Sequence, residues 1–116
     1  MAKKNVALML NHSPYTGSFC EEGLRVAVGT HMAIEGQSVK TICIGDGVYF
    51  GLASLKQGDF LKYIKIFQGM GMELFIEEDS LRDRNIARER LRDDAKVVTR
   101  SEILSILKDS EHVLSF

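Results

Sequence analysis

The stretch VALMLNHSPYTG, residues 6–17, joins a continuous apolar run to a polar loop, and ICIGDGVY, residues 42–49, repeats this pattern. A short unbroken apolar run is typical of a strand that is covered on both faces in a parallel sheet. The loops that follow parallel strands open on the same edge of the sheet, where ligands collect in open α/β folds. The two junctions therefore predict an α/β fold with its functional edge beyond the carboxyl ends of the strands.

The segment between the two junctions has the pattern of a helix. Ser18 and Glu21 have the spacing of a capping box, apolar residues follow at helical intervals, and Gly36 supplies a stop. A strand, a helix and a second strand of these lengths form a right-handed parallel crossover unit.

The rest of the chain continues this alternation. Three further strands are predicted at residues 73–76, 96–98 and 113–116, with a short helix near 48–55, a helix after Asp59 and another that Thr99 and Glu102 cap. We expect one doubly wound domain, residues 1–116, with the order βαβαβαβαβ.

The composition narrows the class of partners. The chain has 116 residues, 45% of them hydrophobic, and a formal net charge of −1. This charge gives no drive toward nucleic acid or an anionic membrane, and no apolar run approaches the roughly 20 residues that span a bilayer. We expect a cytoplasmic protein that contacts neither nucleic acid nor membrane.

Cys20 and Cys43 are too few for a disulfide framework, which indicates reduced thiols.

A charged segment covers residues 82–94 and contains five arginines among acids. Mixed charge of this kind is typical of a solvated helix face with weak ion pairs, and the alternative is a partner surface. Arg82 is a candidate pocket residue because it follows the junction after the third strand.

The first loop holds four candidate pocket residues, His12, Ser13, Tyr15 and Thr16. A histidine at this edge could exchange protons near neutral pH or donate to an anion, although a loop histidine is often only a polar surface residue. The hydroxyl groups before a helix also resemble part of a flavodoxin phosphate loop, which leaves flavin binding as a remote alternative.

Acidic residues follow the second and third strands. Asp46 lies between two glycines and is expected either to cap the turn or to line a pocket. The consecutive acids at 77–79 point in different directions, so no metal site is expected, and Ser80 is expected to cap a helix. No cofactor is predicted.

The two cysteines differ in their surroundings. Cys20 falls in the first turn of the first helix, where the helix dipole favours a thiolate, while the neighbouring Glu21 and Glu22 oppose one. Cys20 is the candidate nucleophile, and Cys43, within an apolar strand, is interpreted as a core residue.

Several motifs together resemble the DsrE/DsrF-like sulfur-relay family, and most closely its DsrF/TusC branch. The resemblance covers nearly the whole chain and rests on SPYTG at 13–17, EGL at 22–24, GDGV at 45–48, SLRDR at 80–84 and the C-terminal apolar strand. It implies a Rossmann-like three-layer α/β/α fold with a mainly parallel five-stranded sheet, and assembly into homo-oligomers or hetero-oligomers. The related subunits would be DsrE/DsrH-like or TusD/TusB-like, acting in sulfur oxidation or tRNA thiolation.

The resemblance also gives Glu77 a particular meaning. In sulfur-carrying members a cysteine stands at the end of the third strand, and Glu77 occupies the matching position here. A carboxylate cannot form a persulfide, because the carrier must be a thiolate. The leading hypothesis is thus an accessory, non-catalytic subunit. The alternatives are an active carrier through Cys20, and a homo-oligomeric protein that binds a small ligand or anion.

Overall fold

A computed structural model describes residues 5–15, 19–33, 38–55, 58–71 and 73–116. Five strands form one sheet, and all of the paired strands are parallel, in the order β4-β3-β2-β1-β5. The strands are β1 Asn5–Leu10, β2 Ser38–Cys43, β3 Glu73–Glu77, β4 Ala95–Val98 and β5 His112–Ser115. The helices are α1 Phe19–Ala33, α2 Gly58–Met70, α3 Glu78–Asp83 and α4 Arg100–Asp109, with 3-10 helices η1 Gly45–Gly51 and η2 Arg88–Arg90.

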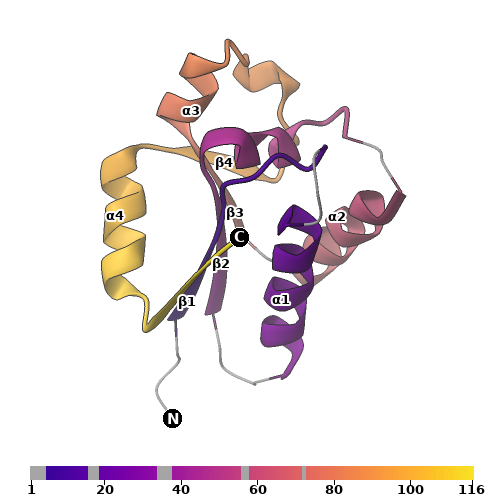
Figure 1. Cartoon of the computed structure of the whole chain (residues 1–116), viewed down its shortest axis with the longest axis vertical. Helices are drawn as coiled ribbons and strands as arrows, with labels where there is room; N and C mark the ends of the chain where they lie inside the picture. Colours follow the sequence, from indigo (N-terminus) through magenta and orange to yellow (C-terminus); the bar gives the residue numbers. More distant parts are fainter. Residues whose placement is uncertain (1–4, 16–18, 34–37, 56–57, 72) are drawn as a thin grey trace.

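The sheet separates two layers of helix. Helices α1 and α2 lie together on one face, and α4 lies on the other (Figure 1). Alternate residues of each strand point to opposite faces, so that the strands supply two apolar clusters. The larger cluster packs beneath α1 and α2, and the smaller one, which includes Ile42, Phe75 and Ile103, packs beneath α4. The predicted three-layer α/β/α fold is confirmed, and the sheet is parallel throughout its described strands.

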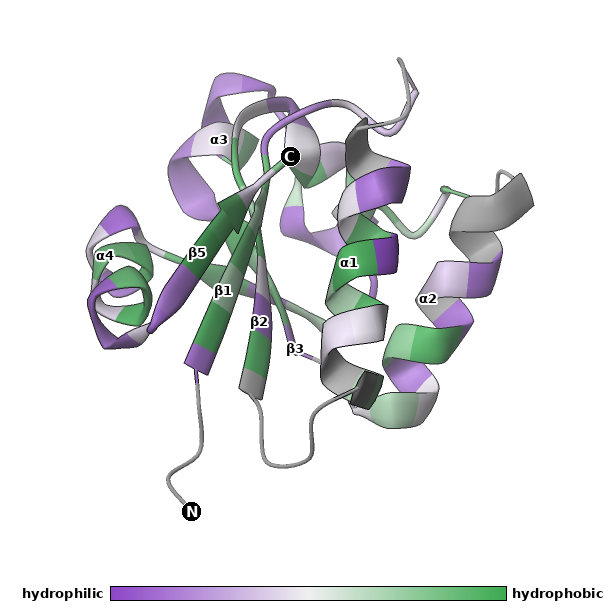
Figure 2. Cartoon of the chain, turned by 60° about the horizontal axis from the view of Figure 1, so that its bottom comes forward, coloured by the Kyte–Doolittle hydropathy of each residue, from purple (hydrophilic) through white to green (hydrophobic). Residues whose placement is uncertain are grey.

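The hydropathy of the chain follows this layering. Green segments run along β1, β2 and β3 in the middle of the sheet, and each helix carries both green and purple segments (Figure 2). Within the described ranges, no helix is long and apolar enough to cross a membrane.

The carboxyl ends of β2, β1 and β5 are held together by backbone hydrogen bonds. The Ile44 N–H donates to Leu10 O at 3.0 Å, and the Asn11 N–H donates to Phe116 O at 2.9 Å. The chain then turns sharply at Gly45, which has a φ of 53°. This left-handed conformation suits glycine, and the turn brings η1 against β2 and β3 and close to Leu10 at the end of β1.

The prediction of one solvated helix face over residues 82–94 was wrong. Helix α3 ends at Asp83, Asn85 has a φ of 53°, and only the short η2 follows. Leu91 forms an isolated antiparallel bridge with Leu52, and the Arg92 N–H donates to Gly51 O at 2.8 Å. Buried apolar residues therefore hold this segment against the core, and the pattern of charges in the sequence does not indicate this.

Arg92 is the clearest exception to the expected solvation. Its side chain is 7% exposed, and its guanidinium carbon lies 4.8 Å from the centre of the Phe50 ring. Burial lowers the pKa of Arg92, an effect that Asp94 opposes. The other arginines behave as predicted where ion pairs are seen: the exposed side chains of Arg82 and Arg88 pair with Glu78.

Candidate functional site

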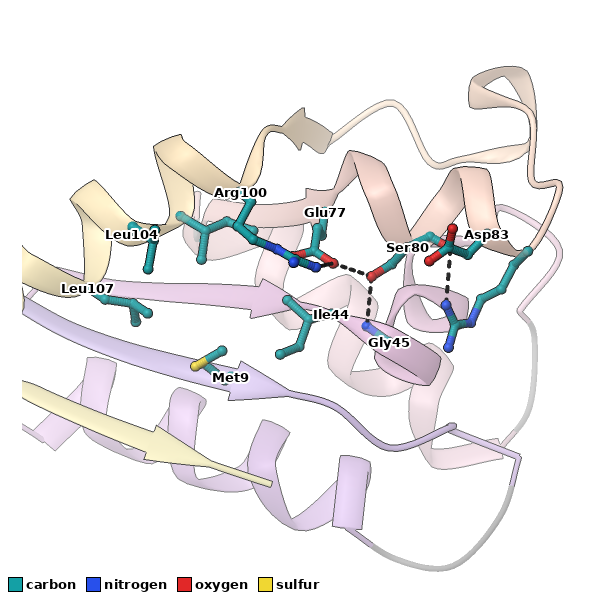
Figure 3. A pocket seen from close by; sticks show the side chains of 11 residues that line it. Met9, Ile44, Gly45, Glu77, Ser80, Asp83, Arg100, Leu104 and Leu107 are labelled. Atoms are coloured by element: carbon teal, nitrogen blue, oxygen red, sulfur yellow. Dashed lines mark hydrogen bonds and ion pairs between the residues drawn. The ribbon is translucent and has the colours of Figure 1, made fainter.

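A cavity of about 450 Å³ opens at the carboxyl edge of the sheet, on the α4 side. One part of its lining is polar and consists of Gly45, Glu77, Ser80, Asp83, Arg84 and Arg100. The other part is apolar and consists of Met9, Ile44, Ile103, Leu104 and Leu107. Figure 3 shows the polar side chains near α3 and the apolar ones along β1 and α4.

Glu77 is the most enclosed charged group of this cavity. Its side chain is 8% exposed, and the Ser80 hydroxyl donates to its Oε1 at 2.5 Å. Ser80 Oγ in turn accepts the Gly45 N–H at 2.9 Å. This relay connects the turn after β2 to the carboxylate at the end of β3 (Figure 3).

Arg100 supplies the opposite charge. Its Nε and Nη2 atoms donate to the two carboxylate oxygens of Glu77, at 3.3 and 3.4 Å. The hydrogen bond with Glu77 is the main reason that the pKa of Arg100 is raised. The Arg100 side chain is 65% exposed, so the pair has one buried and one solvated member.

Arg84 connects two structural elements at the other side of the cavity. It donates to Asp46 Oδ1 through Nη2 at 2.9 Å and through Nε at 3.1 Å, and to Ser80 O through Nη1 at 3.2 Å. These bonds connect η1 to α3 across 38 residues of sequence. Arg84 is thus a fixed structural cation, whereas Arg100 reaches in from the rim.

The strand order explains why Glu77 and Arg100 meet. Glu77 pairs in register with Val98 of the neighbouring strand β4, and α4 begins two residues later. Thr99 caps α4, because its side chain accepts the Glu102 N–H at 3.2 Å, as the capping-box pattern predicted. The cap sets the direction of the first turn, which carries Arg100 over the end of β3.

The predicted pocket residues are only partly brought together. Glu77 lines the cavity, and Asp46 joins it through Arg84. Arg82 lines a separate cavity of about 180 Å³, together with Leu81 and Ile86, and pairs with Asp79.

The first loop lies apart from the cavity lining. His12 is exposed, and Ser13 Oγ accepts the Tyr15 N–H at 3.1 Å, which makes a local turn. The Tyr15 ring packs edge-on against Tyr49, with 6.1 Å between the ring centres. Thr16 lies outside the described residues, as does the expected cap Ser18.

The two cysteines differ in place. Cys20 lies in the first turn of α1, and Cys43 is fully buried in the larger apolar cluster, which confirms its interpretation as a core residue. No cysteine is found among the described residues that line the cavity. Among the described residues, no three His, Cys, Asp or Glu side chains lie together so that they could hold a metal ion.

Two important residues were not in the predicted pocket. Ser80 was expected to cap a helix, but it lies inside α3, where its hydroxyl donates a hydrogen bond to the Glu77 carboxylate. Arg100 is absent from the predicted pocket, because its closeness to Glu77 depends on β4 lying beside β3. The available signal was the capping box at residues 99–102, which places the start of a helix at the functional edge.

Replacing Ser80 with alanine should lower the free energy of unfolding by about 1–3 kcal/mol. The change removes a donor from the buried Glu77 carboxylate and leaves the Gly45 N–H without its acceptor. Urea unfolding measures the effect, with Ser105→Ala, on the exposed face of α4, as the matched control. Equal stabilities for the two variants would contradict the relay.

Comparison with known proteins gives a consistent assignment of fold. Residues 4–116 match the family model described as the DsrE/DsrF-like family. The ychN protein from E. coli has a similar structure, with a TM-score of 0.88, 20% identity and 100% of both chains covered. The protein of unknown function MTH1491 from Methanobacterium thermoautotrophicum has a TM-score of 0.83 and 11% identity, over 98% of this chain and 100% of its own. No curated protein matches the sequence.

Proposed function

Because this chain belongs to the DsrE/DsrF-like family, we propose that it is an accessory subunit of a cytoplasmic sulfur-relay complex. The observation that carries the proposal is the carboxylate of Glu77 at the carboxyl end of β3. This is the position where the family resemblance places a sulfur-carrying cysteine. Family membership by itself connects the chain only with sulfur relay in general.

The surroundings of Glu77 support a stable, non-carrying site. A persulfide carrier needs a thiolate that attacks sulfur and is then attacked in turn, which a carboxylate cannot do. Glu77 is instead held by Ser80 and neutralised by Arg100. We infer that the hydrogen bonds that connect Gly45, Ser80 and Glu77 keep this end of the pocket in a fixed shape.

The accessory role requires a thiol on another chain. We propose that the cavity edge faces the catalytic cysteine of a related subunit, of the DsrE/DsrH or TusD/TusB type. The assembly would serve sulfur oxidation or the formation of 2-thiouridine in tRNA. A homo-oligomer is the alternative arrangement.

Affinity purification from its own cells tests the accessory role. We expect the tagged protein to bring down, in near-stoichiometric amount, a related chain with a cysteine at the end of its third strand. An unrelated tagged protein of similar size serves as the control for background capture. Recovery of this chain only with further copies of itself would contradict the heteromeric role.

Cys20 provides a second candidate function. Its place in the first turn of α1 puts it where backbone N–H groups and the helix dipole favour a thiolate. The chain would then carry sulfur itself, and the sulfur adduct should be lost in Cys20→Ser.

A further inference from the structure

The cavity beside Glu77 presents opposite charges at one end and an aliphatic wall at the other. Glu77 and Asp83 contribute carboxylates, and Arg84 and Arg100 contribute guanidinium groups. The numbers of acidic and basic side chains in the lining are equal. Arg84 is already paired with Asp46, so the pair that a ligand can enter is Glu77–Arg100, and a ligand that leaves both of these charges matched needs a positive and a negative group.

The Glu77–Arg100 pair is the part of the lining that can exchange partners. Its two contacts, at 3.3 and 3.4 Å, are longer than the 2.7–2.9 Å of strong charge-assisted hydrogen bonds. Arg100 is 65% exposed, and ion pairs with a solvated member contribute little to stability. Arg84, in contrast, is fixed by Asp46 and by Ser80 O.

A zwitterion can enter this pair without leaving a charge unmatched. An ammonium group would bind the Glu77 carboxylate, with Asp83 nearby, and the ligand carboxylate would bind Arg100. An anion alone would face two carboxylates, and a cation alone would leave Arg100 without its partner.

The aliphatic wall defines the remainder of the ligand. Ile44 lies next to the polar end of the cavity, and Met9 and Leu107 line it farther from that end (Figure 3). Leu104 is 54% exposed although it is a large apolar side chain, and a bound aliphatic group would cover it. The volume of about 450 Å³ lies within the range of small-ligand pockets.

From these features we propose that the cavity binds a small zwitterion with an aliphatic or thioether side chain, which in chemical class is an α-amino acid. The amino and carboxylate groups bind between Glu77 and Arg100, and the side chain lies along Met9 and Leu104. This proposal does not depend on the proposed sulfur-relay role. The two are tested separately, because binding is measured on the isolated chain without a sulfur donor.

Calorimetric titration and thermal unfolding with L-leucine and L-methionine test the proposal on the wild-type chain. A saturating ligand should raise Tm by about 3 °C or more. The matched probes are 4-methylpentanoate and 3-methylbutylamine, which carry the same aliphatic group with a single charge, and glycine, which lacks it. Each should bind at least about tenfold more weakly, the equivalent of losing one ion pair or the apolar contact.

Variants locate the site. Glu77→Gln and Arg100→Met should each weaken binding about tenfold or more, a loss typical of removing one charged contact. Glu89→Gln and Arg90→Met, at exposed positions outside the cavity lining, should leave it unchanged. Absence of binding by both amino acids, or equal binding of a single-charge probe, would overturn the proposal. Equal loss in the control variants would also overturn it.

Discussion

Replacing Gly47 with alanine should lower the free energy of unfolding by about 3 kcal/mol or more. A Cβ atom at Gly47 would lie 1.9 Å from Leu10 O and 2.6 Å from Leu10 C, which are backbone atoms. Leu10 O already accepts the Ile44 N–H, so it cannot move aside without breaking the junction of β1 and β2. Chemical denaturation followed by circular dichroism measures the loss.

Gly29 provides the matched control. It is exposed within α1, and a Cβ atom there would meet nothing within 4 Å. Gly29→Ala should therefore stabilise the protein by about 0.5–1 kcal/mol, because alanine loses less conformational freedom in a helix. If Gly47→Ala were as stable as wild type, the close approach of η1 to β1 would be contradicted.

Replacing Asp94 with alanine and replacing Arg92 with methionine should each cost about 3 kcal/mol, whereas the double variant should be close to the wild type in stability. Arg92 Nε lies 3.5 Å from Asp94 Oδ1, and the guanidinium nitrogens of Arg92 are buried without a hydrogen-bond partner. Removing Asp94 leaves a buried charge without its counter-ion. Arg92→Met likewise leaves the buried carboxylate oxygens of Asp94 without a counter-ion, and only the double variant removes both charges while methionine keeps an apolar contact with the Phe50 ring.

The double variant distinguishes this explanation from loss of packing. In the Arg92→Met background, Asp94→Ala should cost nothing or should stabilise the protein, which gives a coupling free energy of about 3 kcal/mol or more. Urea titrations of the four proteins supply the cycle. Additive effects, with Asp94→Ala equally costly in both backgrounds, would show that the pair is not coupled.

Much of the fold could be predicted from the sequence, because its signals are local. The apolar runs at residues 6–10 and 39–44 and the capping box at 99–102 each depend on neighbours within a few residues. The corresponding strands β1 and β2 and the helix α4 are all present. A local sequence pattern predicts each helix or strand. Once a parallel sheet is predicted, the carboxyl edge of that sheet is the expected region of the functional site.

The composition of the site was harder to predict, because it depends on the order of the strands. Glu77 was identified, but Arg100 meets it only since β4 lies beside β3. The burial of Arg92 could not be predicted for a related reason. Its neighbours in sequence are charged, while its neighbours in space are Phe50 and the backbone of Gly51.

Intact-mass analysis of the folded chain after incubation with a low-molecular-weight persulfide tests the central claim most directly. In a carrier, a cysteine thiolate attacks the outer sulfur of the donor, the S–S bond of the donor breaks, and its thiolate leaves as a new S–S bond forms on the protein. We predict that the folded wild-type chain gains no sulfur, while the chain unfolded in denaturant, with its thiols accessible, reacts. A reductant-reversible adduct of one sulfur atom on the folded chain, absent from Cys20→Ser and retained in Cys43→Ser, would contradict the accessory role. It would make this chain a carrier through Cys20.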